Sequence, residues 1–324
     1  MTLEDYPRTL LEFEDRFNTE EACRDYLFRL RWPEGFACPR CGAKKGWLGS
    51  RGRVICGACR YQATVTSGTI FADTRKPLRL WFRAMWHVTS QKSGGSAIGL
   101  QRVLGLGGYL TAWTWLHKLR RAMIRPGRDR LSGEVEVDET FVGGTEQAIH
   151  GREAGKKALV VIGVEKRGKH GFGRVRMARI ADASGAVLLS FIESAVEPGS
   201  VICTEGWQGY SGVKARGYQH KAAVLSGQGK DAALQELPRV HRIAGLIKRW
   251  LQGTHQGRVA PDHLDYYLDE YTFRFNRRTS ATRGKLFYRL VQQAVQVDPV
   301  PYSRIVGGRP ALSQPQPVGV GGVN

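Results

Sequence analysis

The sequence lacks any stretch close to the run of about 20 apolar residues that a membrane-spanning helix needs. Its first residues, MTLEDYPRTLLEFEDRF, are acidic, whereas a secretory signal begins with a basic region. Both observations disfavour membrane proteins and exported proteins. We therefore expect a cytoplasmic protein with no membrane partner.

Acidic residues are scarce relative to basic ones. The chain has 29 Asp and Glu against 49 Lys and Arg, a formal net charge of +20 at pH 7. Such a surplus attracts polyanions, above all nucleic acid, whose phosphate counterions are released on binding. An anionic membrane surface is the alternative partner, but the motifs of the chain favour DNA.

Cysteine is sparse as well, and four of the 6 cysteines form two close pairs. The pairs are Cys38-Pro-Arg-Cys41 and Cys56-Gly-Ala-Cys59, and each can form a tight metal-binding turn, or knuckle. Gly42 follows the first knuckle, and Gly57 lies inside the second. Two such knuckles place four thiolates around a tetrahedral Zn²⁺, which explains the pattern better than disulfides or an iron site. We predict a structural zinc ribbon over residues 20–72, with Cys23 and Cys203 as small core residues.

Helical periodicity flanks the ribbon on both sides. Apolar residues recur at near-helical spacing from residue 9 to 31, with a break at Asn18 and Thr19, so residues 1–19 are expected to be a helical lead-in. Residues 77–125 are predicted to be a helical DNA-binding segment, because two short helices joined by a glycine turn have the shape of a helix-turn-helix. A plain helical linker domain is the alternative.

The pattern changes to strands after residue 132. GEVEVDETFV, ALVVIGVEKR and GRVRMARIA are rich in Val or Ile, and a helix, GAVLLSFIESAV, leads to a short strand, SVICT. This order predicts an α/β domain over residues 132–290 with a mixed sheet. Residues 307–324 are rich in Gly, Pro and Gln and are expected to be disordered. The fold class is therefore α+β with several domains.

Carboxylates cluster on the first of these strands. Side chains alternate along a strand, so Glu134, Glu136 and Asp138 share one face, while the valines between them face the core. Glu205 stands where the later strand ends, and a ribonuclease H-like strand order would place it beside the first strand. Two carboxylates brought together there could hold two metal ions about 4 Å apart and cleave a phosphodiester. A solvated, acidic edge strand is the alternative.

The order of these motifs resembles that of insertion-sequence transposases in which a zinc ribbon precedes a DDE-type, ribonuclease H-like domain. The matching stretches are CPRCG, CGACRYQATVTSGTIF, PLRLWF, VEVDETFVGG, TEGWQGY, HRIAGLIKRWLQGTHQGRV and YLDEYTFRFNRR. The resemblance implies transposition, with binding of element ends and target DNA and Mg²⁺-dependent cleavage and strand transfer. It also implies a homo-oligomer assembled on DNA.

By this resemblance, Asp138 and Glu205 are the first two catalytic, Mg²⁺-binding acids. The family has aspartate at the second position, and the longer Glu205 shifts its carboxylate by roughly 1 Å, which can cost about a hundredfold in rate. The third family position, an Asn or Glu, falls on Leu246, which cannot bind a metal. Either an acid such as Asp269 or Glu270 completes the site, or the chain is a catalytically impaired DNA-binding remnant or a repressor of related elements. A zinc-ribbon transcription factor is disfavoured, because it leaves the paired carboxylates unexplained.

Overall fold

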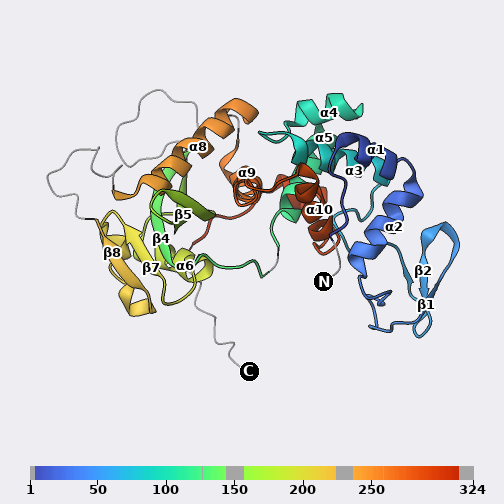
Figure 1. The fold of residues 1–324 in the computed structure, drawn as a ribbon, viewed down its shortest axis with the longest axis horizontal. Helices are drawn as coiled ribbons and strands as arrows, with labels where there is room; N and C mark the ends of the chain where they lie inside the picture. Colours follow the sequence, from blue (N-terminus) through green and yellow to red (C-terminus); the bar gives the residue numbers. More distant parts are fainter. Residues whose placement is uncertain (1–3, 126, 144–156, 224–235, 258, 314–324) are drawn as a thin grey trace, which may run out of the picture. The chain divides into compact units, whose positions relative to one another are not determined.

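The computed structural model describes residues 4–125, 127–143, 157–223, 236–257 and 259–313 (Figure 1). The chain forms two compact units. The first combines Met1–Gly127 with Arg277–Gly307, and the second combines Arg128–Asn276 with Gly308–Asn324. The mixture of helices, a cysteine cluster and a mixed sheet confirms the predicted fold class. Among the described residues, no helix is long and apolar enough to cross a membrane.

The first unit opens with α1 (Leu10–Arg16) and α2 (Glu20–Arg31), separated by a break as the periodicity predicted. Thr19 caps α2, because its hydroxyl accepts a hydrogen bond from the backbone N–H of Ala22. A threonine that satisfies an otherwise unpaired N–H favours starting a new helix at this point over continuing the old one.

Three helices follow the ribbon, in agreement with the predicted helical segment. They are α3 (Leu78–Ser90), α4 (Ala97–Leu104) and α5 (Tyr109–Ala122). Gly105 ends α4 in the left-handed region, with φ of 61°, which lets the chain turn sharply towards α5. The pair α4 and α5 therefore has the connection expected of a helix-turn-helix.

The helices α10 (Arg283–Ala294) and α11 (Tyr302–Val306) also belong to the first unit. The predicted boundary at residue 290 was therefore wrong, because the main segment of the second unit ends at Asn276 and the chain returns to the first unit at Arg277. Figure 1 shows α10, in red, beside α3. Phe287 of α10 lies among aromatic rings of α1, α2 and α3, and these are Phe13, Phe17, Tyr26, Phe82 and Trp86. An amphipathic pattern predicts a buried face but not the core that buries it.

The second unit is built on a five-stranded mixed sheet with the strand order β6-β5-β4-β7-β8. Its strands are β4 (Glu134–Val142), β5 (Ala158–Arg167), β6 (Gly171–Ile180), β7 (Val201–Thr204) and β8 (Gln219–Ala222). The first three are antiparallel, and β7 lies parallel to β4, as the ribonuclease H-like order predicted. The edge strand β8 was not predicted, because its sequence, QHKA, has no apolar alternation.

Helices cover both faces of this sheet. On one face α6 (Gly185–Ala195) packs against buried side chains of β4, β5 and β7. On the other face lie α8 (Pro238–His255) and α9 (Pro261–Phe275). Because β5 is buried on both sides, it reads as a continuous apolar run, ALVVIGV, and not as an alternating pattern.

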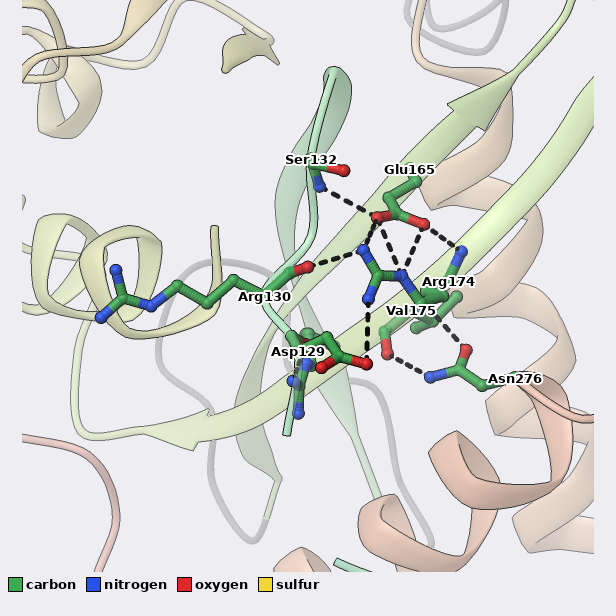
Figure 2. A network of polar contacts seen from close by, with 8 residues as sticks. Asp129, Arg130, Ser132, Glu165, Arg174, Val175 and Asn276 are labelled. Carbon is green, nitrogen blue, oxygen red and sulfur yellow. Dashed lines mark hydrogen bonds and ion pairs between the residues drawn. The ribbon is translucent and has the colours of Figure 1, made fainter. Parts of the chain in front are cut away.

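A polar network ties the ends of β5 and β6 to the end of α9 (Figure 2). Glu165 accepts hydrogen bonds from the side chain and backbone N–H of Arg174 and from the backbone N–H of Ser132. Burial opposes ionisation of Glu165, but the hydrogen bonds from Arg174 outweigh it and lower its pKa. Asn276 accepts from the N–H of Val175 and donates to its C=O, so the polar groups of an edge strand are satisfied by a side chain.

The expectation of disorder from residue 307 was wrong for residues 308–313, which return to the second unit. The N–H of Leu312 donates to the C=O of Arg179 over 2.8 Å, and the N–H of Ala181 donates to the C=O of Leu312 over 3.0 Å. These bonds form a parallel bridge at the free edge of β6. Residues 314–324 lie outside the described part of the chain.

A buried ion pair fixes α8 on the sheet. Glu136 of β4 is 1% exposed and Arg239, in the first turn of α8, is 4% exposed. Arg239 Nη1 donates to Glu136 Oε1 over 2.8 Å. The other carboxylate oxygen accepts from the backbone N–H groups of Arg239 and Val240, at 2.8 and 2.9 Å. The carboxylate thus neutralises the guanidinium and also satisfies N–H groups that a helix start leaves unpaired.

We expect Glu136→Gln to lower the free energy of unfolding of the second unit by about 3–5 kcal/mol, because it leaves a buried guanidinium without its counter-charge. Glu134→Gln is the matched control. Glu134 lies on the same strand face but is partly exposed beside Lys166 and Lys221, so its loss should cost less than about 1 kcal/mol. Urea unfolding of the full chain measures both, and equal losses would contradict the role assigned to Glu136.

Candidate functional site

The four paired cysteines converge in the first unit, around a three-stranded sheet of β1 (Gly46–Leu48), β2 (Val54–Cys56) and β3 (Gln62–Ala63). Their four sulfur atoms lie within 4.8 Å of one another. The Sγ–Sγ distance is 3.7 Å for Cys38 and Cys59 and 3.6 Å for Cys41 and Cys56. Thiolates bound tetrahedrally to zinc at about 2.3 Å would be about 3.8 Å apart. The cysteine geometry therefore fits a structural Zn²⁺.

The backbone of the two knuckles accounts for their glycines only in part. Gly42, after the first knuckle, has φ of 74°, but the same place after the second knuckle is taken by Arg60, with φ of 59°. Gly57 serves close packing instead, since a Cβ there would lie 3.2 Å from the carbonyl oxygen of Lys45. Backbone N–H groups of the second knuckle lower the pKa of Cys56 to about 6. Hydrogen bonds between the thiols outweigh the one from the backbone of Ala43 and raise the pKa of Cys41 to about 12.

In the second unit, Asp138 lies in the middle of β4, and Glu205 lies beside it directly after the end of β7. The parallel register pairs Glu136 with Cys203, and Asp138 and Glu205 each stand two residues further along their strands. Two residues is the period of a strand, so both carboxylates project from the same face as Glu136. This is the face that α8 covers.

A histidine of α8 completes this group. His241 Nε2 lies 2.9 Å from Glu205 Oε1, and Nδ1 lies 3.7 Å from Asp138 Oδ2. One possible metal-binding atom from each of the three residues falls within 4.8 Å of the others. Although Nε2 is buried and close to Glu205, it makes no aligned hydrogen bond within the part of the chain that the structure describes. Adjacent ligands of an octahedral ion bound at about 2.1 Å lie about 3.0 Å apart, which is close to the 2.9 Å between His241 Nε2 and Glu205 Oε1.

Comparisons with known proteins agree with this order of a cysteine-rich domain and a mixed-sheet domain. Residues 130–276 match the family model of the ISXO2-like transposase domain, and residues 18–62 match that of the transposase zinc-ribbon domain. The chain thus carries a transposase zinc-ribbon domain followed by an ISXO2-like transposase domain. A relative described as an uncharacterized protein in transposable element ISH50 of Halobacterium salinarum is 24% identical over 278 residues, which are 80% of this chain and 91% of the relative.

The position expected for the third ligand of the transposase lies on the wrong side of α8. Leu246 follows His241 by five residues, which is about 140° around a helix, and it packs against the apolar core. Lys248 follows His241 by seven residues, about 20° from alignment, and its Nζ donates to Thr140 Oγ1 over 2.8 Å. Thr140 shares the strand face of Asp138. The helical spacing of His241 and Lys248 was the signal that could have identified this face.

Asp269 and Glu270 of the transposase serve other contacts. Asp269 Oδ2 lies 2.5 Å from Arg309 Nη1, and Glu270 Oε1 lies 2.9 Å from Arg274 Nε. Among the described residues, neither acid belongs to the group around Asp138. The interpretation that an acid of α9 completes the site was therefore wrong.

The carboxylate of Asp138 is partly removed from water and is repelled by neighbouring carboxylates. Burial, together with the neighbouring Glu205 and Glu139, raises the pKa of Asp138 to about 7. Glu139 itself accepts a hydrogen bond of 2.8 Å from the buried Tyr210 on the other side of the strand. A divalent cation relieves such repulsion, since it favours the ionised form of each carboxylate around it.

We expect the purified transposase to hold one Zn²⁺ per chain and Cys56→Ser to lose it, because a zinc ribbon depends on all four thiolates to fold. Cys203→Ser is the matched control. Cys203 is buried in the second unit, so this variant should keep its zinc. Metal content measured by mass spectrometry tests both, and a zinc-free wild-type protein with an ordered ribbon would contradict the assignment.

Proposed function

We propose that the chain is a catalytically competent transposase that binds the ends of its element and carries out divalent-metal-dependent cleavage and transfer of DNA strands. The observation that carries the proposal is the group formed by Asp138, Glu205 and His241. Two carboxylates and a buried imidazole nitrogen meet where β7 ends beside the parallel strand β4, and a buried ion pair holds the helix that supplies the third group.

Asp138 and Glu205 would hold the catalytic cation, with His241 as the third side chain. Mg²⁺ or Mn²⁺ bound there supplies Lewis acidity for the attacking and leaving oxygens of a phosphodiester. Lys248 lies on the same face of α8 and offers a positive charge to the phosphate being cleaved. An imidazole ligand suits ions later in the transition series better than it suits Mg²⁺, so we expect Mn²⁺ to support the reaction at least as well.

DNA binding belongs to the first unit in this proposal. The ribbon, over residues 20–72, and the helical segment, over residues 77–125, would grip the element ends, with target DNA near the carboxylates. Basic side chains gather around the ribbon, namely Arg40, Lys44, Lys45, Arg53 and Arg60. Phosphate contacts of this kind position a protein on DNA without reading its sequence. Cleavage at two element ends requires at least two active sites, so we propose a homo-oligomer on DNA. Because a bacterial-type host keeps its DNA in the cytoplasm, we also propose that the protein acts there.

The second candidate is a catalytically silent remnant or repressor. It is favoured by Glu205, which stands where the family pattern has aspartate. Its other support was Leu246, and that support weakens once His241 is counted as the third group. DNA binding without cleavage is the behaviour that separates this candidate from an active enzyme.

We expect Asp138→Asn to reduce nicking of a labelled duplex that carries the element's terminal repeats by about a hundredfold or more, because the cation loses a charged ligand. Affinity for the duplex should change by less than about twofold, since Asp138 belongs to the second unit and the proposed DNA-gripping segments belong to the first. Mg²⁺ and Mn²⁺ are each tested. Nicking by the variant at the wild-type rate would refute the metal site, and tight binding without nicking by the wild type would favour the silent candidate.

We expect His241→Ala to weaken Mn²⁺ binding by about tenfold or more, measured by titration calorimetry without DNA. Leu246→Asn should leave the Mn²⁺ affinity unchanged, because that side chain packs against the core. The control is His170→Ala, which removes an exposed imidazole from the β5–β6 turn. A gain of Mn²⁺ affinity in Leu246→Asn, with no loss in His241→Ala, would indicate that position 246 and not His241 is the place of the third metal ligand.

A further inference from the structure

The sheet of the zinc ribbon presents a row of side chains to solvent. The register pairs Trp47 of β1 with Ile55 of β2, and Ile55 with Gln62 of β3. Residues paired across antiparallel strands project from the same face, so these three side chains lie side by side. Trp47 is 46% exposed and Gln62 is exposed, whereas Val54 and Ala63, on the opposite face, are buried.

Trp47 differs from the other tryptophans of the chain. All 8 lie among the described residues, and Trp47 is the exposed one, while the others are buried or half-buried. Arg60 Cζ lies 5.0 Å from the centroid of its ring, within the range of a cation–π contact. A single exposed apolar side chain is common on protein surfaces. The argument for a partner therefore depends on what surrounds the ring.

Arg60 reaches the ring from a backbone conformation that suits glycine better. It follows the second knuckle with φ of 59°, whereas Gly42 follows the first knuckle with φ of 74°. The left-handed region is unfavourable for a residue with a Cβ, so the fold by itself would favour glycine at position 60. An arginine there indicates that its side chain has a use other than folding.

Positive charge surrounds the row. Arg53 Nη1 donates to Gln62 Oε1 over 2.9 Å, so a second guanidinium stands at the other end from Arg60. Residues 35–72 contain six Lys or Arg and no Asp or Glu, whereas four thiolates with Zn²⁺ would carry only about two negative charges. We define the ribbon platform as Trp47, Ile55, Gln62, Arg53 and Arg60. It combines an aromatic face with a surplus of positive charge.

We propose that the ribbon platform binds an unpaired nucleotide of DNA, with the base stacked on Trp47 and neighbouring phosphates held by Arg53 and Arg60. A nucleotide supplies a flat ring and an anion in one unit, which matches the aromatic face and the charge of the platform. In a duplex both faces of an internal base are covered by its neighbours, so stacking on Trp47 requires a base outside the stack. The inference rests on the proposed DNA binding, and it adds that the ribbon recognises frayed or nicked element ends.

Trp47→Ala tests the platform in the full chain, with Leu48→Ala as the matched control. Leu48 is the next residue of β1, is 75% exposed and projects from the opposite face. Fluorescence anisotropy measures the affinity for a fully paired duplex and for the same duplex with a central run of unpaired thymines. We expect the wild type and Leu48→Ala to prefer the second DNA by about tenfold and Trp47→Ala to lose this preference.

Salt dependence separates stacking from charge. Stacking releases no phosphate counterion, so Trp47→Ala should leave the slope of log K against log[salt] unchanged. Arg60→Gly should reduce this slope by about 1, because one phosphate contact is lost. Its Tm should not fall below that of the wild type, since glycine suits the left-handed backbone. A lower Tm with an unchanged slope would make Arg60 a structural residue and overturn its assignment.

A conservative variant and the zinc content keep the test independent of folding. Trp47→Tyr retains an aromatic face and should keep most of the preference, and both Trp47 variants should hold zinc. An intact preference in Trp47→Ala, its absence in Trp47→Tyr, or loss of zinc in Trp47→Ala would each overturn the proposal. So would a DNA-free dimer of the wild type that Trp47→Ala abolishes, which would indicate an interface between copies of the chain.

These outcomes do not depend on cleavage. A wild-type chain that fails to nick DNA but shows the Trp47-dependent preference would refute the proposed catalysis and leave the platform supported. Nicking without that preference would refute the platform alone. A wild type that binds neither DNA would refute the proposed DNA binding and the platform with it.

Discussion

The pairing of Glu136 with Arg239 is the contact on which the rest of the second unit depends. It joins a central strand to the start of α8 across 103 residues of sequence. Glu136 stands two residues before Asp138, and Arg239 stands two residues before His241, so the same pair sets the position of both. An ion pair buried this deeply adds little net stability over an apolar replacement. Its role here is to select one placement of α8 on the sheet.

Three carboxylates on one face of β4 show how far the surroundings decide the role of a residue type. Glu134 lies at the partly exposed end of the strand and pairs with two lysines. Glu136 is enclosed and serves the fold. Asp138 lies further along the same face, where a second carboxylate and an imidazole approach it. Strand alternation places all three on one face, and only the neighbours distinguish a structural acid from a candidate metal ligand.

The two units are interleaved along the chain. The chain leaves the first unit near residue 127, returns to it at residue 277, and sends residues 308–313 back to the second. The aromatic core of the first unit therefore depends on Phe287, which comes after the whole sheet domain in sequence. A chain cut before α10 would leave these rings exposed to water, at the usual free-energy cost of exposing apolar area.

Local patterns carried most of the secondary structure. Several features depend only on neighbours in sequence, and the sequence alone determined them. They are the knuckle spacing of Cys38–Cys41 and Cys56–Cys59, the break at Thr19, the alternation in β4 and the apolar run of β5. A ribonuclease H-like strand order placed Glu205 beside the strand of Asp138, while the catalytic role of both residues stays a prediction. The tertiary structure decided that His241 and not Leu246 faces these acids, that Asp269 pairs with Arg309, and that α10 joins the first unit. Each of these depends on which face of a helix meets a partner distant in sequence, and a periodic pattern contains no information on the identity of that partner.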